Sequence, residues 1–319
     1  MSLWLRIFQA LTTQGRVPSL SIVMLLRSMP DLSPANRSFR EWFYTRWGRE
    51  NCLILGRARH AEYARFRQRL SIKMARGGGE RYFLDGRSVA VDDDSYLVLN
   101  DGRSYGSLID TDQEVESFSI FFRPGLLEEV SSAMRVPIDD IPAYSHRFAG
   151  SIEFDEQLRP HDQAVSPVMR FIRHHILDGV DDDRWYEEQL HVLAARLLAQ
   201  QHRTTQAVLR LDCAKASTRQ ELHRRVGLAA DFMQSNYERD IGLDDIAAAA
   251  CLSVHHFMRL FRRVHSMTPT QFLYRKRVQV ALRLLQQSNL PAQDIASRVG
   301  FNSRATFYRQ LKRWRNQTP

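Results

Sequence analysis

The C-terminal part of the chain contains one sequence pattern twice, and this repetition limits the possible folds more than any other feature. Asp245-Ile246-Ala247 recurs as Asp294-Ile295-Ala296, 49 residues later. Phe257-x-x-x-Phe261 recurs as Phe307-x-x-x-Leu311 at an offset of 50, so the second copy has one extra residue, Asn302, in between. A diverged repeat of this kind indicates two copies of one supersecondary unit.

Each copy is predicted to form a short helix, a tight turn and a second helix. In the first copy Cys251-Leu252 make the turn, and Ser253 stands where it can cap the second helix. Apolar residues at positions i, i+3, i+4 and i+7 then give that helix a face that packs inward. The inward residues are Phe257, Leu260, Phe261 and Val264, and in the second copy Phe307, Leu311 and Trp314.

The opposite faces of these two helices, which we call the reading helices, carry basic and hydrogen-bonding side chains. A helix with one apolar stripe and one such polar stripe has what is needed to read bases in the major groove of DNA. A single amphipathic basic helix would be a weak signal, but two in a fixed register indicate a DNA-binding unit. The candidate DNA-binding residues are Ser253, His255, Met258, Arg259, Arg262, Ser303, Arg304, Ala305, Tyr308, Arg309 and Lys312.

The positions of these residues along the reading helices predict different roles. Arg259 and Arg309 occupy matching places in the middle of the outward stripes, where we expect them to reach base edges or the phosphates beside them. Arg262 and Lys312 lie one turn further along and are expected to contact phosphates. The serines at the two helix starts are expected to help position the phosphate backbone.

The segment between the two copies is predicted to be a single helix. Pro269 can begin a helix, because its missing N–H is not needed in the first turn. The segment Thr270–Gln287 that follows favours helix, and its apolar side consists of Phe272, Leu273, Val280, Leu284 and Leu285. These 18 residues would span ~27 Å, which suits two reading helices in major-groove segments roughly 34 Å apart.

The positive charge of the chain is concentrated at the same end. The whole chain carries a net charge of +9, but the segment 252–319 alone holds 13 lysines and arginines against one acid, Asp294. The other residues together hold 32 basic and 35 acidic side chains. A basic surface confined to one end favours a polyanionic partner, because each neutralised phosphate releases condensed counterions. The charge therefore supports double-stranded promoter DNA as the partner.

With these motifs, the stretch from about Ile241 to Pro319 resembles the DNA-binding domain of AraC/XylS-type bacterial transcription regulators. The resemblance rests on Asp245-Ile246-Ala247, Leu252-Ser253, Phe257-x-x-x-Phe261, Thr268-Pro269, Arg277-x-x-x-Ala281-x-x-Leu284-Leu285, Ile295-Ala296-x-x-Val299-Gly300-Phe301, Ser303, Phe307 and Thr318-Pro319. It implies a fold of seven helices, base contacts from the second helix of each unit, and activation or repression through promoter binding. We expect an effector-responsive activator that works with RNA polymerase.

The chain departs from the family pattern in two places. The family usually has glycine before each Thr/Ser-Pro pair, where this chain has Ser266 and Asn316. Because asparagine tolerates a left-handed helix end better than serine does, the end of the first reading helix is expected to be strained or built differently. The chain also stops at Pro319, a few residues before the family's usual end, so a final helix is expected to be missing.

Short strand-like runs dominate the chain from about Cys52 to Arg123 and predict a small β-barrel or sandwich. Ser117–Phe122 alternates and is aromatic, and Ser95–Leu99 is a compact apolar run. Asp85-Gly86 and Asp101-Gly102 lie between such runs, as hairpin turns do. With Gly79-Glu80-Arg81-Tyr82, Ser95-Tyr96-Leu97 and Phe121-Phe122-Arg123-Pro124-Gly125, the strand-rich region within residues 39–150 is similar to the cupin-like sensory domains that accompany the family. This similarity implies binding of a small-molecule effector or dimerisation. The predicted fold class is therefore α+β.

Periodicity and proline positions predict the organisation of the remaining segments. Residues 1–38, interrupted by prolines, are expected to be an arm of unknown role. Residues 151–216 are expected to form a helical linker, in which Gln201–Ala216 lose periodicity, and residues 217–319 the DNA-binding domain. An apolar stripe is expected to be core or, less favoured, a seam for a homodimer through residues 155–200. It consists of Tyr186, Leu190, Leu193, Ala194 and Leu197.

Two other function classes compete with DNA binding. A cupin-type metalloenzyme needs clustered histidines with a carboxylate, yet between Cys52 and Gly150 only His60 and His146 occur. We therefore expect no enzyme activity, no metal and no cofactor. A protein adaptor with incidental DNA binding is disfavoured by the repeated basic face, and binding without sequence preference would revive it.

The composition places the chain in a reducing compartment. Cys52, Cys213 and Cys251 are odd in number and form no CxxC pair, which argues against a disulfide framework. The longest purely apolar run near the start, Ile22–Leu26, is far shorter than the ~18 residues a membrane span needs. We expect a cytoplasmic protein with no membrane partner.

Overall fold

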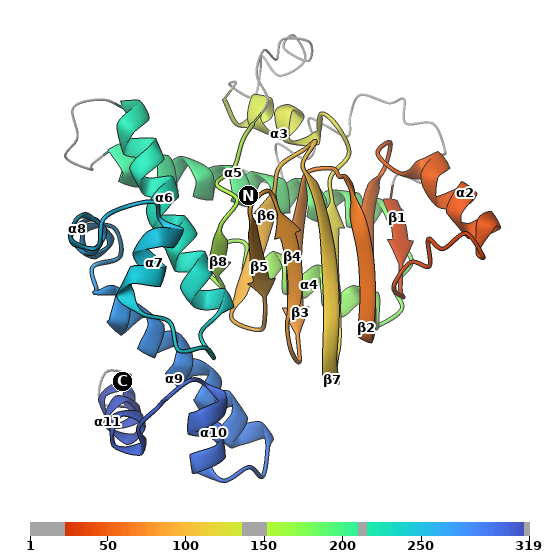
Figure 1. Cartoon of the computed structure of the whole chain (residues 1–319). Coiled ribbons are helices and arrows are strands. Elements are labelled where there is room, and N and C mark those ends of the chain that lie inside the picture. Colours follow the sequence, from red (N-terminus) through yellow and green to blue (C-terminus); the bar gives the residue numbers. More distant parts are fainter. Residues whose placement is uncertain (1–22, 136–151, 210–215, 316–319) are drawn as a thin grey trace. The chain divides into compact units, whose positions relative to one another are not determined.

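The computed structural model of the chain describes residues 23–135, 152–209 and 216–315 (Figure 1). The chain divides near Ala207 and Val208 into two compact units. The first, N-terminal unit contains a sheet with helices, and the second, C-terminal unit is helical in its described part apart from Ser88–Ala90 of one strand, so the α+β class predicted from the sequence is confirmed at this level. No described helix has the length and apolar character to cross a membrane.

The N-terminal unit is built on one eight-stranded sheet. Its strands are β1 (Val23–Leu26), β2 (Asn51–Arg67), β3 (Ser71–Arg76), β4 (Glu80–Leu84), β5 (Arg87–Val91), β6 (Ser95–Leu99), β7 (Ser104–Phe121) and β8 (Leu158–Pro160). The strand order is β1-β2-β7-β3-β6-β8, with β4 paired to both β5 and β7. β1 runs parallel to β2, whereas β7 runs antiparallel to β2, β3 and β4.

The sheet has two differently covered faces, because successive side chains of a strand point to opposite sides. On one face Leu53, Ile72 and Ile120 belong to a core that includes residues of α3 (Leu126–Arg135), α4 (Ser166–Leu177) and α5 (Asp183–Leu209). In Figure 1 α4 and α5 lie behind the strands. On the other face Ile54 and Phe121 pack with Phe43 of α2 (Arg37–Arg46).

The prediction that residues 1–38 form a separate arm is wrong for the part that begins at Val23. β1 pairs with the start of β2 from Val23↔Asn51 to Leu26↔Ile54, and Val23 and Met24 are buried in the two cores. A strand of four residues is too short to be recognised from alternating apolar and polar residues. Its position in the sheet becomes clear only from its pairing with β2. The earlier residues of that arm lie outside the described part.

Only one of the two predicted hairpin turns joins neighbouring strands. Asp85-Gly86 links β4 to β5, which pair, and Gly86 has the positive φ of +71° that such a turn favours. Asp101-Gly102 also forms a turn, with φ +75° at the glycine, but it leads from β6 to β7, and β3 lies between these strands. Local turn chemistry predicted the reversal correctly and the strand partner incorrectly.

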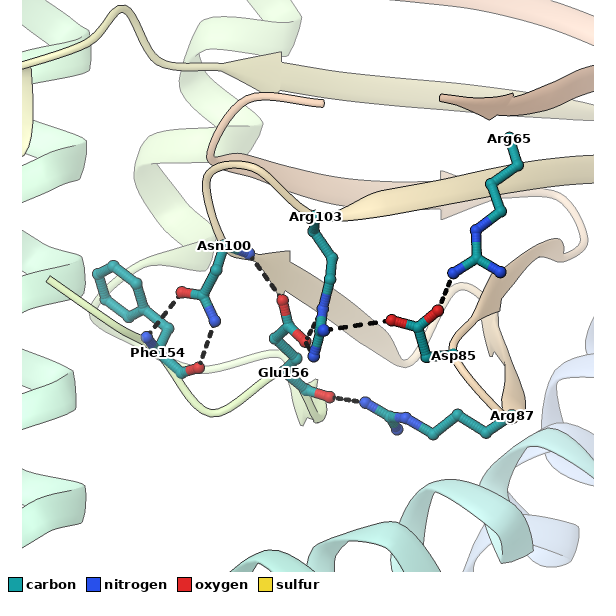
Figure 2. A network of polar contacts seen from close by, with 7 residues as sticks. All are labelled: Arg65, Asp85, Arg87, Asn100, Arg103, Phe154 and Glu156. Atoms are coloured by element: carbon teal, nitrogen blue, oxygen red, sulfur yellow. Dashed lines mark hydrogen bonds and ion pairs between the residues drawn. The ribbon is translucent and has the colours of Figure 1, made fainter. Parts of the chain in front are cut away.

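A polar network fastens the segment before β8 to the end of β6 (Figure 2). Asn100 and Phe154 exchange two hydrogen bonds, in which the Asn100 amide donates to the Phe154 carbonyl at 2.9 Å and accepts from its N–H at 2.8 Å. Glu156, whose side chain is almost fully buried, accepts from Asn100 N at 3.0 Å and from Arg103 Nε at 2.7 Å. Arg103 also reaches Asp85. These bonds bring the chain back into the sheet, where β8 pairs with β6.

Helix α5 confirms the core interpretation of the predicted apolar stripe and corrects the linker. All five stripe residues are buried in the core of the N-terminal unit, so they are not available as a dimer seam. The helix itself continues to Leu209, through most of the stretch that we predicted to be non-periodic. The C-terminal unit then consists of α6 (Ala216–Ser235), α7 (Leu243–Ala249), α8 (Val254–His265), α9 (Pro269–Gln287), α10 (Ala292–Arg298) and α11 (Arg304–Arg315).

Candidate nucleic-acid interface

The predicted duplication is present in three dimensions as two helix-turn-helix units, α7–α8 and α10–α11. In the first turn Leu252 N donates to Ala247 O at 3.1 Å, and in the second Phe301 N donates to Ala296 O at 2.9 Å. These residues are the repeat equivalents of one another, so the two turns are closed by the same hydrogen bond. The predicted connecting helix is also present as α9.

The two turns reverse the chain with different residues. Cys251 has a φ of +51° in the first turn, and Gly300, its repeat equivalent, has a φ of +84° in the second. Residues other than glycine adopt this left-handed region at a cost, because Cβ approaches the backbone. The first turn therefore carries a strain that glycine avoids in the second.

Each reading helix is anchored by its own hydrophobic core. Phe257, Leu260 and Phe261 of α8 are buried in a cluster with residues of α6 and α7. Phe307 of α11 is fully buried in a second cluster with residues of α9 and α10, and Leu311 packs against it. The inward faces predicted from the sequence are thus confirmed, and burial of the apolar side turns the other side of each helix to solvent.

All eleven candidate DNA-binding residues are solvent-exposed. Met258 and Tyr308, the two least polar large side chains among them, are 40% and 49% exposed. Within the described residues, the side chains of Arg259, Arg262 and Lys312 have no hydrogen-bond or ion-pair partner, while Arg309 donates to Thr306 Oγ1 of its own helix at 3.2 Å. These basic side chains are therefore free to bind a ligand outside the chain.

The predicted capping serines stand at the starts of the reading helices. Ser253 is the N-cap residue of α8, but its side chain makes no capping hydrogen bond. Ser303 holds the same place before α11, and its hydroxyl accepts from Thr306 N at 3.4 Å. Phe257 N and Phe307 N donate to the carbonyls of the two serines at 2.8 and 3.0 Å. The Ser253 hydroxyl is thus left for an external partner such as a phosphate oxygen.

Two basic residues that the charge count assigned to the DNA-binding surface are buried instead. Lys276 and Arg277 of α9 are only 4% and 6% exposed. Arg277 donates from Nε to Tyr237 O and from Nη2 to Arg239 O, both at 2.7 Å, and lies over the Phe301 ring. It ties α9 to the segment between α6 and α7. A count of charges does not separate such an internal contact from a surface cation.

The end of the first reading helix has the conformation that the family glycine would favour. Ser266 is the C-cap residue of α8, with a left-handed φ of +56°, and its N–H donates to Arg262 O. The expectation of strain at this departure agrees with this geometry. Asn316, the second departure, lies outside the described residues.

The residue before that cap, His265, is half-buried between two aromatic rings. Its ring centroid lies 4.3 Å from that of Phe261 and 5.2 Å from that of Phe272, and its Nε2 has no hydrogen-bond partner in the described part of the chain. Burial, reinforced by repulsion from His223, lowers the pKa of His265 to about 4. The imidazole is therefore neutral in the folded protein at neutral and mildly acidic pH.

This burial makes the stability of the C-terminal unit dependent on pH. In the unfolded chain His265 titrates near its ordinary value of 6.5, so between pH 6.5 and about 4 the unfolded state holds the extra proton. Acidification across this window should lower the free energy of unfolding by about 2–3 kcal/mol. Urea denaturation of His265→Phe should lack this part of the pH dependence, and His255→Gln, an exposed histidine of α8, should retain it. An unchanged pH profile in His265→Phe would refute the assignment.

Comparison with known proteins bears on the same part of the chain. A family model described as a helix-turn-helix domain matches residues 246–319. The chain is 31% identical over 90 residues to the probable transcription factor PqrA of Proteus vulgaris, which covers 28% of this chain and 74% of PqrA. It is 29% identical over 112 residues to the HTH-type transcriptional regulator AlkR of Acinetobacter baylyi, covering 35% of this chain and 37% of AlkR.

A solved structure is similar over the same region. A transcriptional regulator of Chromobacterium violaceum, described as containing an AraC-type DNA-binding domain, is 26% identical, and the match covers 32% of this chain and 88% of that one. The TM-score of this match is 0.28. The chain spans about a third of the length of the first curated relatives that it matches.

Proposed function

Because this chain belongs to the AraC/XylS family of transcription regulators, we propose that it binds promoter DNA sequence-specifically through α8 and α11 and regulates transcription. The observation that supports this most is the repetition of one turn and one exposed basic stripe in two helix-turn-helix units. Two reading helices supported by one connecting helix suit two adjacent segments of the major groove.

The exposed side chains are proposed to have two different roles in DNA recognition. Arg259 and Arg309 contact base edges or the phosphates beside them, whereas Arg262 and Lys312 contact phosphates. Their lack of partners among the described residues, apart from the bond of Arg309 to Thr306, means that binding DNA breaks few internal contacts.

The N-terminal unit is proposed to be a cupin-like sensory domain whose effector makes the protein an activator that works with RNA polymerase. A mainly antiparallel sheet with one face packed against helices and the other partly polar is consistent with that role. A homodimer through residues 155–200 would have to use exposed side chains of α4 and α5, such as Phe171 and Leu177, because the apolar stripe of α5 is internal.

The test compares single substitutions against a library of randomised DNA sites at several salt concentrations. Arg259→Ala and Arg309→Ala are each expected to weaken the preferred site by ~1–3 kcal/mol and to relax preference at one position. Lys312→Ala should weaken all sequences alike and reduce the slope of log affinity against log salt by about one. The reason is that base contacts carry sequence information and phosphate contacts do not.

The matched control is Arg298→Ala, which removes an exposed cation from α10 instead of from a reading helix. It should leave the preferred sequence unchanged. If Arg259→Ala and Arg309→Ala also weaken every site equally, the assignment of base-reading residues is wrong even though DNA binding survives. If the intact chain shows no preference among the sites, the proposed function itself fails.

A further inference from the structure

A cavity of about 60 Å³ lies on the face of the sheet that carries α2. Its lining comes from β2, β3, β4 and β7, from α2 and from the segment between β1 and α2, all within the N-terminal unit. The volume is several times what one water molecule needs. Side chains of this face therefore leave room for a small molecule inside the unit.

One of the residues that line this cavity is a buried lysine. Lys73 of β3 is 2% exposed, and its Nζ donates to Ser119 Oγ at 3.2 Å. The same ammonium lies 3.7 Å from the centroid of the Phe121 ring and 5.3 Å from that of Tyr105. An ammonium has three N–H donors, and within the described residues Lys73 has one hydrogen-bond acceptor. The remaining donors face aromatic rings and the cavity.

The buried acid nearest to this lysine has partners of its own. Glu80 of β4 accepts from Ser117 Oγ at 2.6 Å and shares a hydrogen bond with Tyr82. No ion pair joins Glu80 to Lys73 within the described residues, although both side chains line the cavity. The carboxylate is thus satisfied by hydroxyl groups, and the ammonium is left to attract an anion.

A second polar group of the cavity wall is the side-chain oxygen of Gln68. Gln68, between β2 and β3, is 7% exposed, and its Oε1 has no hydrogen-bond partner among the residues that the structure describes. A buried acceptor left without a donor costs about 1–3 kcal/mol. The amide oxygen therefore points to a ligand that brings a donor.

The rest of the wall is mainly aromatic. The rings that line the cavity belong to Phe43, Trp47, Tyr63, Phe66, Tyr82, Tyr105 and Phe121. Flat apolar surfaces of this kind favour a compact hydrocarbon body, and one lysine beside one satisfied carboxylate matches a single negative charge. A dianionic phosphate would meet too few donors and the field of Glu80.

We propose that this cavity binds a small organic acid, with its carboxylate on Lys73 Nζ, its apolar body among the rings and a donor group on Gln68 Oε1. The inference rests on the proposed function, because this acid would be the effector that the N-terminal unit senses. Recognition depends on a charge-assisted hydrogen bond from a lysine that is itself buried.

The experiment measures the thermal midpoint of the full chain with three acids and their uncharged amides. The probes are 4-hydroxyphenylacetate, 4-hydroxycyclohexanecarboxylate and 6-hydroxyhexanoate, each with a hydroxyl group that can donate to Gln68 Oε1, compared with the matching amides of the same hydroxy acids. At least one acid should raise the midpoint by several degrees in a saturable way, because it binds only the folded chain, and its amide should not. Lys73→Met should lose this rise, and Arg298→Ala, which removes a cation from the other unit, should keep it.

Three results would overturn the proposal: no rise with any acid, an equal rise with the matching amide, or a rise that persists in folded Lys73→Met. The comparison of acid with amide uses the wild-type chain and does not depend on how a variant folds. A gel shift with promoter DNA on the same samples reports DNA binding separately. Failure of acid binding with intact sequence-specific DNA binding would contradict this inference alone.

Discussion

Lys73→Met is expected to raise the free energy of unfolding of the ligand-free protein at pH 7 by roughly 3 kcal/mol. Burial lowers the pKa of Lys73 from 10.5 to about 7, against a smaller opposing effect of Glu80. At pH 7 the unfolded chain holds a fully charged, hydrated lysine, and the folded chain must desolvate that charge or release the proton. Methionine has a similar shape and no charge, so it removes this cost.

The pH dependence of the free energy of unfolding tests the same cause independently. Between pH 7 and 10.5 the unfolded state holds the extra proton, so the wild-type chain gains stability as pH rises through this window. The advantage of Lys73→Met should therefore fall by about half between pH 7 and pH 9, as measured by urea denaturation. Cys52, Glu80, Tyr82 and Tyr105 also face this lysine, but they are present in both proteins.

A control substitution at the same site should change the free energy of unfolding in the opposite direction. Ser119→Ala removes the hydroxyl that accepts the lysine's hydrogen bond and leaves the charge in place. It is expected to destabilise the chain by about 1–2 kcal/mol. If Lys73→Met destabilises the protein as a packing change would, the lysine is a structural element of the sheet and not a binding group held ready at a cost in stability.

Gly300→Ala is expected to destabilise the C-terminal unit by about 2–4 kcal/mol. A Cβ at this position would lie 2.6 Å from Tyr237 O and 2.8 Å from Glu238 O, and the φ of +84° is unfavourable for alanine in any case. Both neighbours are backbone atoms, so relief requires a shift of the segment between α6 and α7. Chemical denaturation followed by circular dichroism measures the loss.

The repeat supplies the matched control, Cys251→Gly. Cys251 occupies the same place in the first turn with a φ of +51°, and its side chain is exposed. Glycine relieves the left-handed strain but adds freedom to the unfolded chain, so stability should be unchanged or up to ~1 kcal/mol higher. Gly300→Ala adds a Cβ atom and Cys251→Gly removes one. If the two substitutions change the free energy of unfolding by equal amounts in opposite directions, the close approach of Tyr237 and Glu238 to Gly300 contributes nothing.

The C-terminal unit could be predicted from the sequence because its signals are local. The apolar positions at i, i+3 and i+4 fix which side of α8 and α11 packs inward, and all eleven candidates consequently lie on the exposed side. Pro269 begins α9 as expected. Whether the exposed residues contact bases or phosphates remains a prediction.

The N-terminal unit was less predictable because its structure depends on partners distant in sequence. Lys73 alternates with Ile72 and Met74 in β3, a pattern typical of a strand with one solvent-exposed face. That face is covered by α2, whose position the alternation does not report. The turn at Asp101-Gly102 likewise indicates where the chain reverses but not that β3 lies between the strands it joins.

Helix α9 contributes Leu273 to the core beneath α8 and Val278, Val280 and Ala281 to the core beneath α11. One continuous helix therefore fixes the distance and the rotation between the two helix-turn-helix units. Inserting a single base pair between two half-sites turns the second one by roughly 34° around the duplex axis. Two helix-turn-helix units joined by a flexible linker could rotate relative to each other to follow that change. Here α9 is part of both hydrophobic cores, so the two units cannot rotate independently. Its target promoters should therefore tolerate base substitutions in either half-site more readily than any change in the spacing between them.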